Sequence, residues 1–426
     1  MLYETVVKNI RIPGKDDLYH LAIDDGRFVA ITTSPIEGEV EWEGAGGLAL
    51  PPFVEMHTHL DTVLTAGKTL VNQSGTLMEG IQKWQERKAF LTEEDVMERA
   101  TKALELLIQH GALYVRAAVD ISDPNLTALK ALLKLRSRFR SMIDLQIIAF
   151  PQDGLMSTPD NQERLVTAVQ LGADAVSAVP HLERTRESGV RSLEVCFEIA
   201  KKHDVFVHIF GDEVDDEHSR YLEVIADLTI REGMEGRVTV SHANALAYYS
   251  NSYAAKVISL AKQAELTIVA CPLINSAMQG RYDSYPKGRG ITRVKELNDA
   301  GVNVCIAHDD IQSPFYPFGT GNLLQAAHMG AHLAHMTGKE EVNDIFKMIT
   351  ENGAKAFGVA EYGIEVGKEA NFIILPTTNQ TDALSHQPPS RYVFRKGQLI
   401  VESKPMLVKW VGRSAALRDG GTGRDH

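Results

Sequence analysis

The chain has 426 residues, of which 44% are hydrophobic and 23% are charged, and this composition excludes disorder or collagen-like repetition for most of its length. Its formal net charge of -12 argues against a protein that binds the phosphate backbone of nucleic acid. The N-terminal segment has no signal-peptide pattern, and no apolar run is long enough to span a membrane. We therefore expect a cytoplasmic protein that binds neither nucleic acid nor a membrane.

The three cysteines are widely spaced, which favours buried free thiols in a reducing compartment over a disulfide framework. They are Cys196, Cys271 and Cys305. Because the chain has no CxxC pair, we expect no cysteine-based zinc site.

Both ends of the chain have the pattern of β structure. LYHLAIDDGRFVAITT contains two apolar runs around Asp24-Asp25-Gly26, a turn sequence that predicts a hairpin. GIEVGKEANFIIL and RYVFRKGQLIVES have the same style near the other end. Because chain termini often lie close together, we predict that residues 1–50 and 363–411 form one composite β domain. Residues 412–426 are polar and rich in glycine, and we predict a disordered tail there.

The central part of the chain alternates apolar, β-branched runs with amphipathic stretches that often end at glycine. The runs are LALPPFVEMHTH at 48, ALYVRAAVDI at 112, IDLQIIAFP at 143, DAVSAVP at 174, DVFVHIF at 204, RVTVSH at 237, LTIVACP at 266 and VNVCIAHD at 302. Apolar strands separated by helices predict a parallel sheet covered by helices. Eight strands favour a (β/α)8 TIM barrel over residues 51–362, and an open doubly wound sheet is the alternative.

A barrel makes a specific demand, because its chemistry sits at the carboxyl ends of the strands. Polar residues do gather there: His57 and His59 on the first run, Gln152 after the third, His208 and Glu213 around the fifth, His242 on the sixth, and Asp309 and Asp310 after the eighth. This distribution predicts a functional site at the mouth of the barrel.

His57 and His59 are the strongest local signal. Residues two apart on a strand project to one face, so both imidazoles can reach one cation. Asp309 supplies a carboxylate, and this ligand set suits Fe(II) or Zn(II). The alternative is a pair of hydrogen-bonded histidines without a metal. Glu213 is the nearest carboxylate past the fifth strand and is our candidate general acid, although a solvated loop charge gives the same pattern.

Several long segments resemble the cytosine deaminase branch of the amidohydrolase superfamily. They are PPFVEMHTHLDT, NQSGTLMEGIQKW, DLQIIAFPQDG, RVTVSH, QGRYDSYPKGRGITRVKEL and HDDIQSPFYPFGTGN. The resemblance implies a distorted (β/α)8 barrel with a β-sandwich built from both termini. It also implies one iron or zinc ion and hydrolysis of cytosine to uracil and ammonia.

The resemblance also implies residue roles around the metal. His57 and His59 resemble the metal-binding pair, and Asp309 resembles the aspartate that binds the metal and takes a proton from the water. His242 resembles the histidine that orients the hydroxide and stabilises charge on it.

On the substrate side, Glu213 resembles the glutamate that carries a proton to the ring nitrogen. Gln152 resembles the amide that reads the pyrimidine carbonyl and ring N–H, and Asp310 resembles the carboxylate beside the exocyclic amino group. Independently of the resemblance, Phe315 and its neighbour Tyr316 are candidates to roof the pocket, since flat rings stack on heterocycles. Loop packing is the alternative for both rings.

The sequence departs from the family pattern in two places. Family members carry a metal-binding histidine on the fifth strand, and alignment on Glu213 puts Phe210 there, whereas alignment on the histidine itself selects His208. We prefer His208 as the ligand. On the second strand, Ala117 and Ala118 stand where the family often has threonine and histidine. These changes either reshape the substrate pocket or mark a member without metal or catalysis.

Three hypotheses follow. The first is a metal-dependent aminohydrolase in which metal-bound hydroxide attacks cytosine or a cytosine-like heterocycle and ammonia leaves, a role in pyrimidine metabolism. The second is a related amidohydrolase for a different or bulkier cyclic amidine or amide. The third is a metal-free relative that binds a ligand without catalysis. We expect a small heterocyclic substrate and a homo-oligomer.

Overall fold

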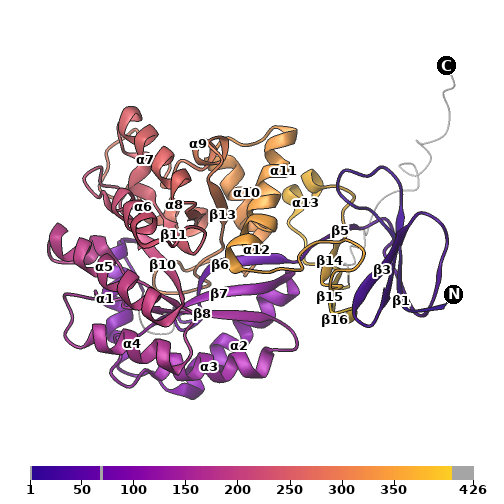
Figure 1. The fold of residues 1–426 in the computed structure, drawn as a ribbon, viewed down its shortest axis with the longest axis horizontal. Helices are drawn as coiled ribbons and strands as arrows, with labels where there is room; N and C mark the ends of the chain where they lie inside the picture. Colours follow the sequence, from indigo (N-terminus) through magenta and orange to yellow (C-terminus); the bar gives the residue numbers. More distant parts are fainter. Residues whose placement is uncertain (1, 68–70, 405–426) are drawn as a thin grey trace, which may run out of the picture.

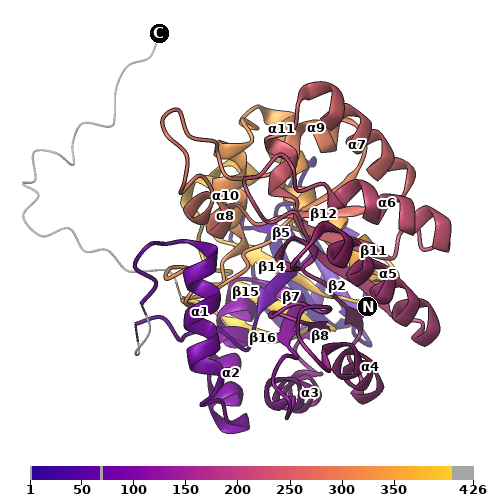
Figure 2. The same cartoon turned by 90° about the vertical axis from the view of Figure 1, so that its left-hand side faces the viewer.

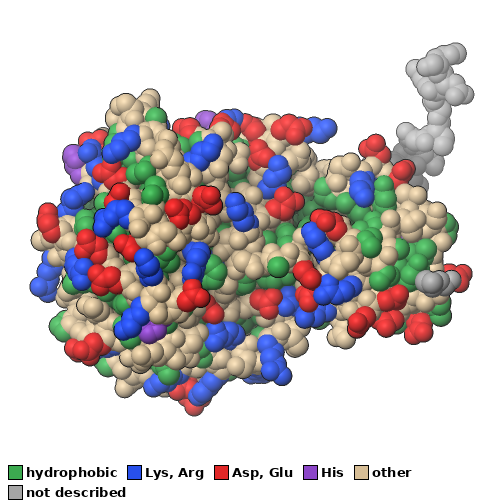
Figure 3. All heavy atoms as spheres, in the orientation of Figure 1, with side chains coloured by type: hydrophobic (Ala, Val, Ile, Leu, Met, Phe, Trp, Pro, Cys, Tyr) green, Lys and Arg blue, Asp and Glu red, His purple; other side chains and the backbone are tan. Residues whose placement is uncertain are grey.

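The computed structural model describes residues 2–67 and 71–404. A large body of strands wrapped by helices carries a smaller body of β-sheet at one side (Figure 1). Within the described ranges, no helix combines the length and the apolar character needed to cross a bilayer. On the face drawn in Figure 3, acidic and basic side chains are interspersed.

The large body is built on an eight-stranded sheet whose paired strands run parallel to one another. Its strands are β6 (Phe53–His59), β7 (Ala112–Asp120), β8 (Asp144–Phe150), β9 (Ala175–Val176), β10 (Phe206–Gly211), β11 (Val238–His242), β12 (Thr267–Ala270) and β13 (Asn303–Ile306). They lie side by side in chain order, and β13 contacts β6 to close the ring. The predicted fold class, a (β/α)8 barrel with an additional sheet domain, is confirmed.

Helices surround the strands (Figure 2). They are α1 (Leu77–Lys88), α2 (Glu93–Gln109), α3 (Thr127–Phe139), α4 (Asn161–Leu171), α5 (Arg186–His203), α6 (Tyr221–Glu232), α7 (Asn251–Gln263), α8 (Pro272–Met278), α9 (Val294–Asp299), α10 (Leu323–Leu333), α11 (Lys339–Met348), α12 (Glu351–Phe357) and α13 (Gln380–His386), with 3-10 turns at Pro180–Leu182 and Asn244–Ala247. Threonine caps begin several of them, as at Thr92, whose side chain accepts a hydrogen bond from the Asp95 N–H. Gly233 ends α6 in the left-handed conformation that favours glycine.

The small body consists of two four-stranded sheets. One has the order β3-β2-β1-β4 and the other β16-β15-β14-β5. Their strands are β1 (Leu2–Ile10), β2 (Tyr19–Asp24), β3 (Arg27–Thr32), β4 (Glu37–Glu43), β5 (Leu48–Leu50), β14 (Phe372–Leu375), β15 (Tyr392–Arg395) and β16 (Gln398–Glu402). Rings from both ends of the chain meet between the sheets, with the centroids of Phe28 and Phe372 5.4 Å apart. The predicted hairpin at Asp24-Asp25-Gly26 joins β2 to β3. The predicted domain limits stay a prediction, and the predicted tail at 412–426 lies outside the described residues.

The first predicted run, at 48, forms two strands instead of one. Pro51 and Pro52 lack backbone N–H groups, so they interrupt the ladder. The residues before them pair with β14 in the small body as β5, and the residues after them enter the barrel as β6. This break therefore places the two histidines in the barrel.

The buried Glu55 carboxylate links the two ends of the barrel sheet. It accepts hydrogen bonds from the backbone N–H of His57 at 3.1 Å and of His308 at 2.9 Å. Burial raises the pKa of Glu55 to about 8. These bonds hold the end of β6 beside the segment after β13, where Asp309 lies.

Candidate functional site

The residues singled out in the sequence come together at the carboxyl ends of the barrel strands. His57 and His59 end β6, His242 ends β11, and Asp309 follows β13. Gln152 follows β8 and lines the same pocket as His59, His242 and Asp309. Barrel enzymes place their chemistry at this end.

Two of these residues have an unusual backbone. His242 has a backbone φ of 71° and Asp309 has a φ of 68°. Both values lie in the left-handed region, which residues other than glycine rarely adopt. The Thr58 hydroxyl donates a hydrogen bond to the Asp309 carbonyl at 2.9 Å and helps to hold that conformation. Strained backbone of this kind is concentrated at functional sites.

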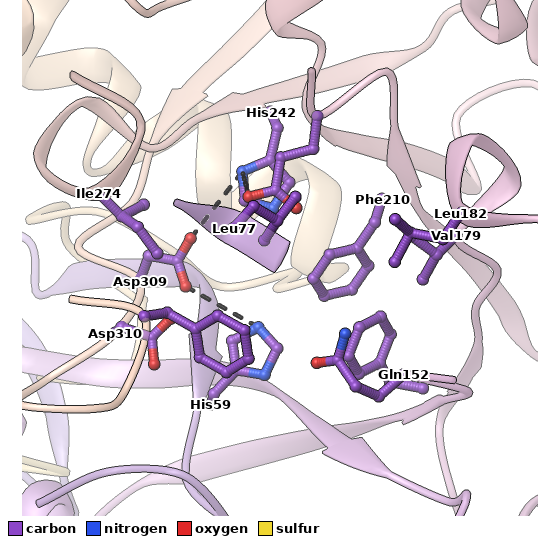
Figure 4. A pocket seen from close by; sticks show the side chains of 13 residues that line it. His59, Leu77, Gln152, Val179, Leu182, Phe210, His242, Ile274, Asp309 and Asp310 are labelled. Carbon is purple, nitrogen blue, oxygen red and sulfur yellow. Dashed lines mark ion pairs between the residues drawn. The ribbon is translucent and has the colours of Figure 1, made fainter. Parts of the chain in front are cut away.

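The Asp309 carboxylate is the centre of the polar cluster (Figure 4). Its Oδ2 lies 3.7 Å from His57 Nε2 and 4.0 Å from His242 Nδ1, and its Oδ1 lies 3.9 Å from His59 Nε2. Both carboxylate oxygens and His57 Nε2 are buried and have no hydrogen-bond partner among the described residues. Buried polar atoms nearly always have a hydrogen-bond partner in native proteins. We infer that these three atoms face a space that a bound ion or molecule can fill.

Two sets of side chains offer ligand atoms that all lie within 4.8 Å of one another. They are His57, His242, Cys271 and Asp309, and His59, Asp309 and Asp310. The pKa of His57 lies well below its usual value because of burial and the neighbouring imidazoles, and burial raises that of Asp309 well above its usual value. Neutral imidazoles are metal ligands, and a cation favours the carboxylate form. The donors therefore fit a divalent metal ion.

The structure separates the roles of His208 and Phe210 on β10. His208 is buried, and its Nε2 lies 2.9 Å from His57 Nδ1, the ring nitrogen other than the one beside Asp309. Phe210 lines the pocket, with its ring centroid 4.6 Å from that of His57 and 5.4 Å from that of His59. His208 is in neither ligand set. In the structure the His208 Nε2 atom lies against His57, and the role of His208 as a metal ligand stays a prediction.

Glu213 and Asp310 supply carboxyl groups on the substrate side. Glu213 Oε1 lies 3.6 Å from His242 Nδ1. Burial, followed by the charge of Asp310, raises the pKa of Glu213 to about 8, so it holds a proton at neutral pH. Asp310 accepts a hydrogen bond from the Thr62 hydroxyl at 3.1 Å, and burial raises its pKa to about 6. Glu213 can therefore donate a proton while Asp310 is ionised.

The pocket itself is small and largely apolar, enclosing about 360 Å³ with the space at its mouth included. Its polar lining comes from the residues above, and its apolar lining is Leu77, Phe150, Val179, Leu182, Phe210, Ile274 and Phe315. The predicted position of Phe315 at the pocket agrees with this lining. Flat, apolar walls with a few directed polar groups suit a small aromatic ring.

Sequence reasoning missed two polar side chains of the cluster. Cys271 directly follows β12, and Asn275 Oδ1 lies 3.3 Å from His242 Nδ1. The strand-end rule contains the signal for Cys271, because LTIVACP is the seventh predicted run and Cys271 stands at its end. Without a CxxC pair, however, the sequence does not mark Cys271 as a metal ligand. All three cysteines are buried and free, as predicted.

Comparison with known proteins decides the family. The Amidohydrolase family pattern matches residues 45–401, which is most of the chain. The chain belongs to the amidohydrolase family. It is a hydrolase that acts on carbon–nitrogen bonds.

Within this family the chain is similar to deaminases and to related hydrolases. The structure of 5-methylcytosine deaminase from Klebsiella pneumoniae with 5-fluorocytosine superposes with a TM-score of 0.92 and 39% identity, over 95% of this chain and 99% of that one. The predicted resemblance to the cytosine deaminase branch is thereby confirmed.

Other relatives share less sequence. N-isopropylammelide isopropyl amidohydrolase of Pseudomonas sp. (strain ADP) is 28% identical, over 95% of this chain and 99% of its own length. Pterin deaminase of Rhizobium rhizogenes is 27% identical, over 84% of this chain and 82% of its own length.

Proposed function

We propose that this amidohydrolase removes the exocyclic amino group of a cytosine-like heterocycle and releases ammonia. The observation that carries the proposal is that the Glu213 carboxyl group, the Gln152 amide and the candidate metal donors His59 and Asp309 line one small pocket. The 39% identity with a 5-methylcytosine deaminase supports the same substrate class.

His57, His59 and Asp309 are the side chains that would hold a divalent ion of the Fe(II) or Zn(II) class, since both imidazole Nε2 atoms face the Asp309 carboxylate. His57 Nε2 and both Asp309 oxygens also have no hydrogen-bond partner among the described residues. When bound, such an ion supplies a water-derived nucleophile at neutral pH. Asp309 would accept the proton that the water loses, because its free oxygens face the same space.

The remaining residues bind the ring and move the second proton. The Gln152 amide has both a donor and an acceptor, which matches a ring carbonyl beside a ring N–H. Glu213 delivers its proton to the ring nitrogen next to the attacked carbon. The proton that Asp309 took from the water passes to the amino group, the carbon–nitrogen bond breaks, and ammonia leaves. The added hydroxyl returns its proton to Glu213 as the ring carbonyl forms. Asp310 accepts a hydrogen bond from that amino group, and His242 stabilises the developing charge.

A second substrate class, bulkier cyclic amidines or amides, is favoured by the aliphatic side chains of Leu77, Val179 and Leu182 on the pocket wall. The similarity to N-isopropylammelide isopropyl amidohydrolase points the same way.

The test uses protein loaded with zinc or iron and measures the amine released from each compound. The amine is ammonia for cytosine, 5-methylcytosine, 5-fluorocytosine and pterin, and isopropylamine for N-isopropylammelide. We expect turnover of a pyrimidine. Preference for the alkylated triazine would select the second class. Absence of turnover with every compound, from a sample shown to carry metal, would contradict the proposal.

A further inference from the structure

Cys271 is a buried thiol beside the metal donors. It lies between the end of β12 and Pro272, the first residue of α8, and its exposed fraction is 0%. Its Sγ lies within 4.8 Å of ligand atoms of His57, His242 and Asp309. The thiol therefore lies next to the Asp309 carboxylate, the central carboxylate of the cluster.

Polar atoms around the thiol form no hydrogen bonds with the described residues. His57 Nε2, His242 Nε2 and both carboxylate oxygens of Asp309 are buried without a hydrogen-bond partner among the described residues. A buried thiol that served only as a small apolar side chain would not need four unpartnered polar atoms around it.

The thiol follows β12, whereas β10 presents an apolar ring at the mouth of the barrel. In the sheet order, β6, β13, β12 and β11 are neighbours, and the segments at their carboxyl ends carry His57, Asp309, Cys271 and His242. On β10, the next strand, the side chain at the mouth is the ring of Phe210, which cannot bind a metal. The two sets of ligand atoms thus contain no imidazole from β10, and one of them contains the thiol that follows β12.

We propose that Cys271 is a ligand of the metal ion, and that its thiolate supplies the coordination that Phe210 does not. On binding, the S–H bond breaks, a sulfur–metal bond forms, and the proton is released to solvent. A thiolate among imidazoles and a carboxylate favours a borderline-soft ion such as zinc over iron. This inference rests on the metal-dependent reaction proposed above for the same site.

Cobalt substitution tests the ligand directly, because thiolate bound to Co(II) gives a charge-transfer absorption in the near ultraviolet that nitrogen and oxygen ligands do not. We expect this absorption in the wild-type protein and its loss in Cys271→Ser. Cys305→Ser is the matched control, because Cys305 is a buried thiol on β13 outside both ligand sets, and it should keep the absorption. An identical spectrum in wild type and Cys271→Ser would overturn the inference.

Zinc affinity gives a second readout on the same variants. Loss of an outer-shell partner costs roughly 10–100-fold in metal affinity, so we expect Cys271→Ser to weaken zinc binding at least about tenfold in a chelator competition, and Cys305→Ser to leave it unchanged. Equal zinc affinity in wild type and Cys271→Ser would count against a ligand.

X-ray absorption at the zinc edge of the wild-type protein avoids any effect of substitution on folding. A sulfur neighbour at about 2.3 Å is expected, and a shell of nitrogen and oxygen alone would overturn the inference. Ammonia release from the same sample keeps the two proposals apart. If the sample releases ammonia but the zinc has no sulfur neighbour, the Cys271 ligand is ruled out and the deaminase proposal stands. If the zinc has a sulfur neighbour but no heterocycle is turned over, the Cys271 ligand stands and the deaminase proposal is ruled out.

Discussion

The two halves of the barrel mouth differ in chemistry although both are built from strand ends. One half, formed at β6, β13, β12 and β11, carries His57, His59, His242, Asp309 and Cys271, and we call it the polar arc. The other, formed at β7, β8, β9 and β10, carries a packed cluster that we call the apolar arc: Ala118, Ile148, Phe150, Ala175, Val179 and Phe210. A substitution that removes a donor from one arc therefore leaves the donors of the other in place.

The two departures from the family pattern belong to the same arc. Phe210 stacks on Phe150 with ring centroids 4.0 Å apart, and Ala118 packs in the same cluster. A side chain larger than a methyl group at position 118 would compete with these rings for space. We infer that Ala118 and Phe210 form one packing arrangement, and that Phe210 serves as a wall of the pocket.

The largest expected effect comes from removing the acidic proton of Glu213, which lines the pocket. Glu213→Gln keeps the shape of the side chain and removes its acid, so kcat for ammonia release should fall about 10²–10⁴-fold. Metal content should not change, because Glu213 is in neither ligand set. Glu217→Gln, in the same loop but exposed, is the control and should retain wild-type kcat. A Glu213→Gln enzyme with normal kcat would remove the acid role.

Substitution in the apolar arc should separate packing from metal binding. Phe210→Ala removes a buried ring, and such changes lower the free energy of unfolding by about 3–5 kcal/mol. Metal stoichiometry should persist, and KM should rise because the pocket loses a wall. Phe197→Ala, buried on α5, should cost similar stability in a denaturant titration without changing KM. Loss of metal in Phe210→Ala alone would show that the arcs are not independent.

The pH dependence follows from the two carboxyl groups on the substrate side. Glu213 must be protonated to donate, and its pKa is raised to about 8, so kcat/KM should be lost as pH rises through that value. Asp310 must be ionised to accept, and its pKa is raised to about 6, so activity should also be lost as pH falls through that value. A bound cation favours carboxylates and moves both limbs to lower pH. A rate that still climbs above pH about 8 would contradict this assignment.

The smallest expected effect is on ring recognition. Gln152→Ala removes one donor and one acceptor, and a neutral hydrogen bond contributes about 0.5–1.5 kcal/mol, so KM should rise up to about tenfold for each bond lost. The rate at saturation should change less, because Gln152 touches no group that moves a proton. Steady-state kinetics with 5-methylcytosine would measure the split, and a fall in kcat alone would contradict a binding role.

Periodic patterns predicted the barrel because each strand and helix is encoded locally. The strand-end rule then placed His57, His59, His242 and Asp309 at one mouth without knowledge of the family. The sequence alone did not decide which of His208 and Phe210 occupies the ligand position on β10, because residues two apart project to the same face of a strand. Their roles depend on the side chains that each one contacts on other strands. For Phe210 that neighbour is Phe150, on a different strand, and for His208 it is His57. The strand-end rule also points to Cys271, but a lone cysteine has no partner at a fixed spacing that would mark it as a metal ligand.

Metal analysis of the purified protein is the most direct test of the account. After loading with zinc or iron and removal of free ions, the wild-type chain should carry one divalent ion, and Asp309→Asn, which removes the carboxylate shared by both ligand sets, should carry none. A wild-type protein that retains no ion after loading would contradict the claim that the polar arc is a metal site.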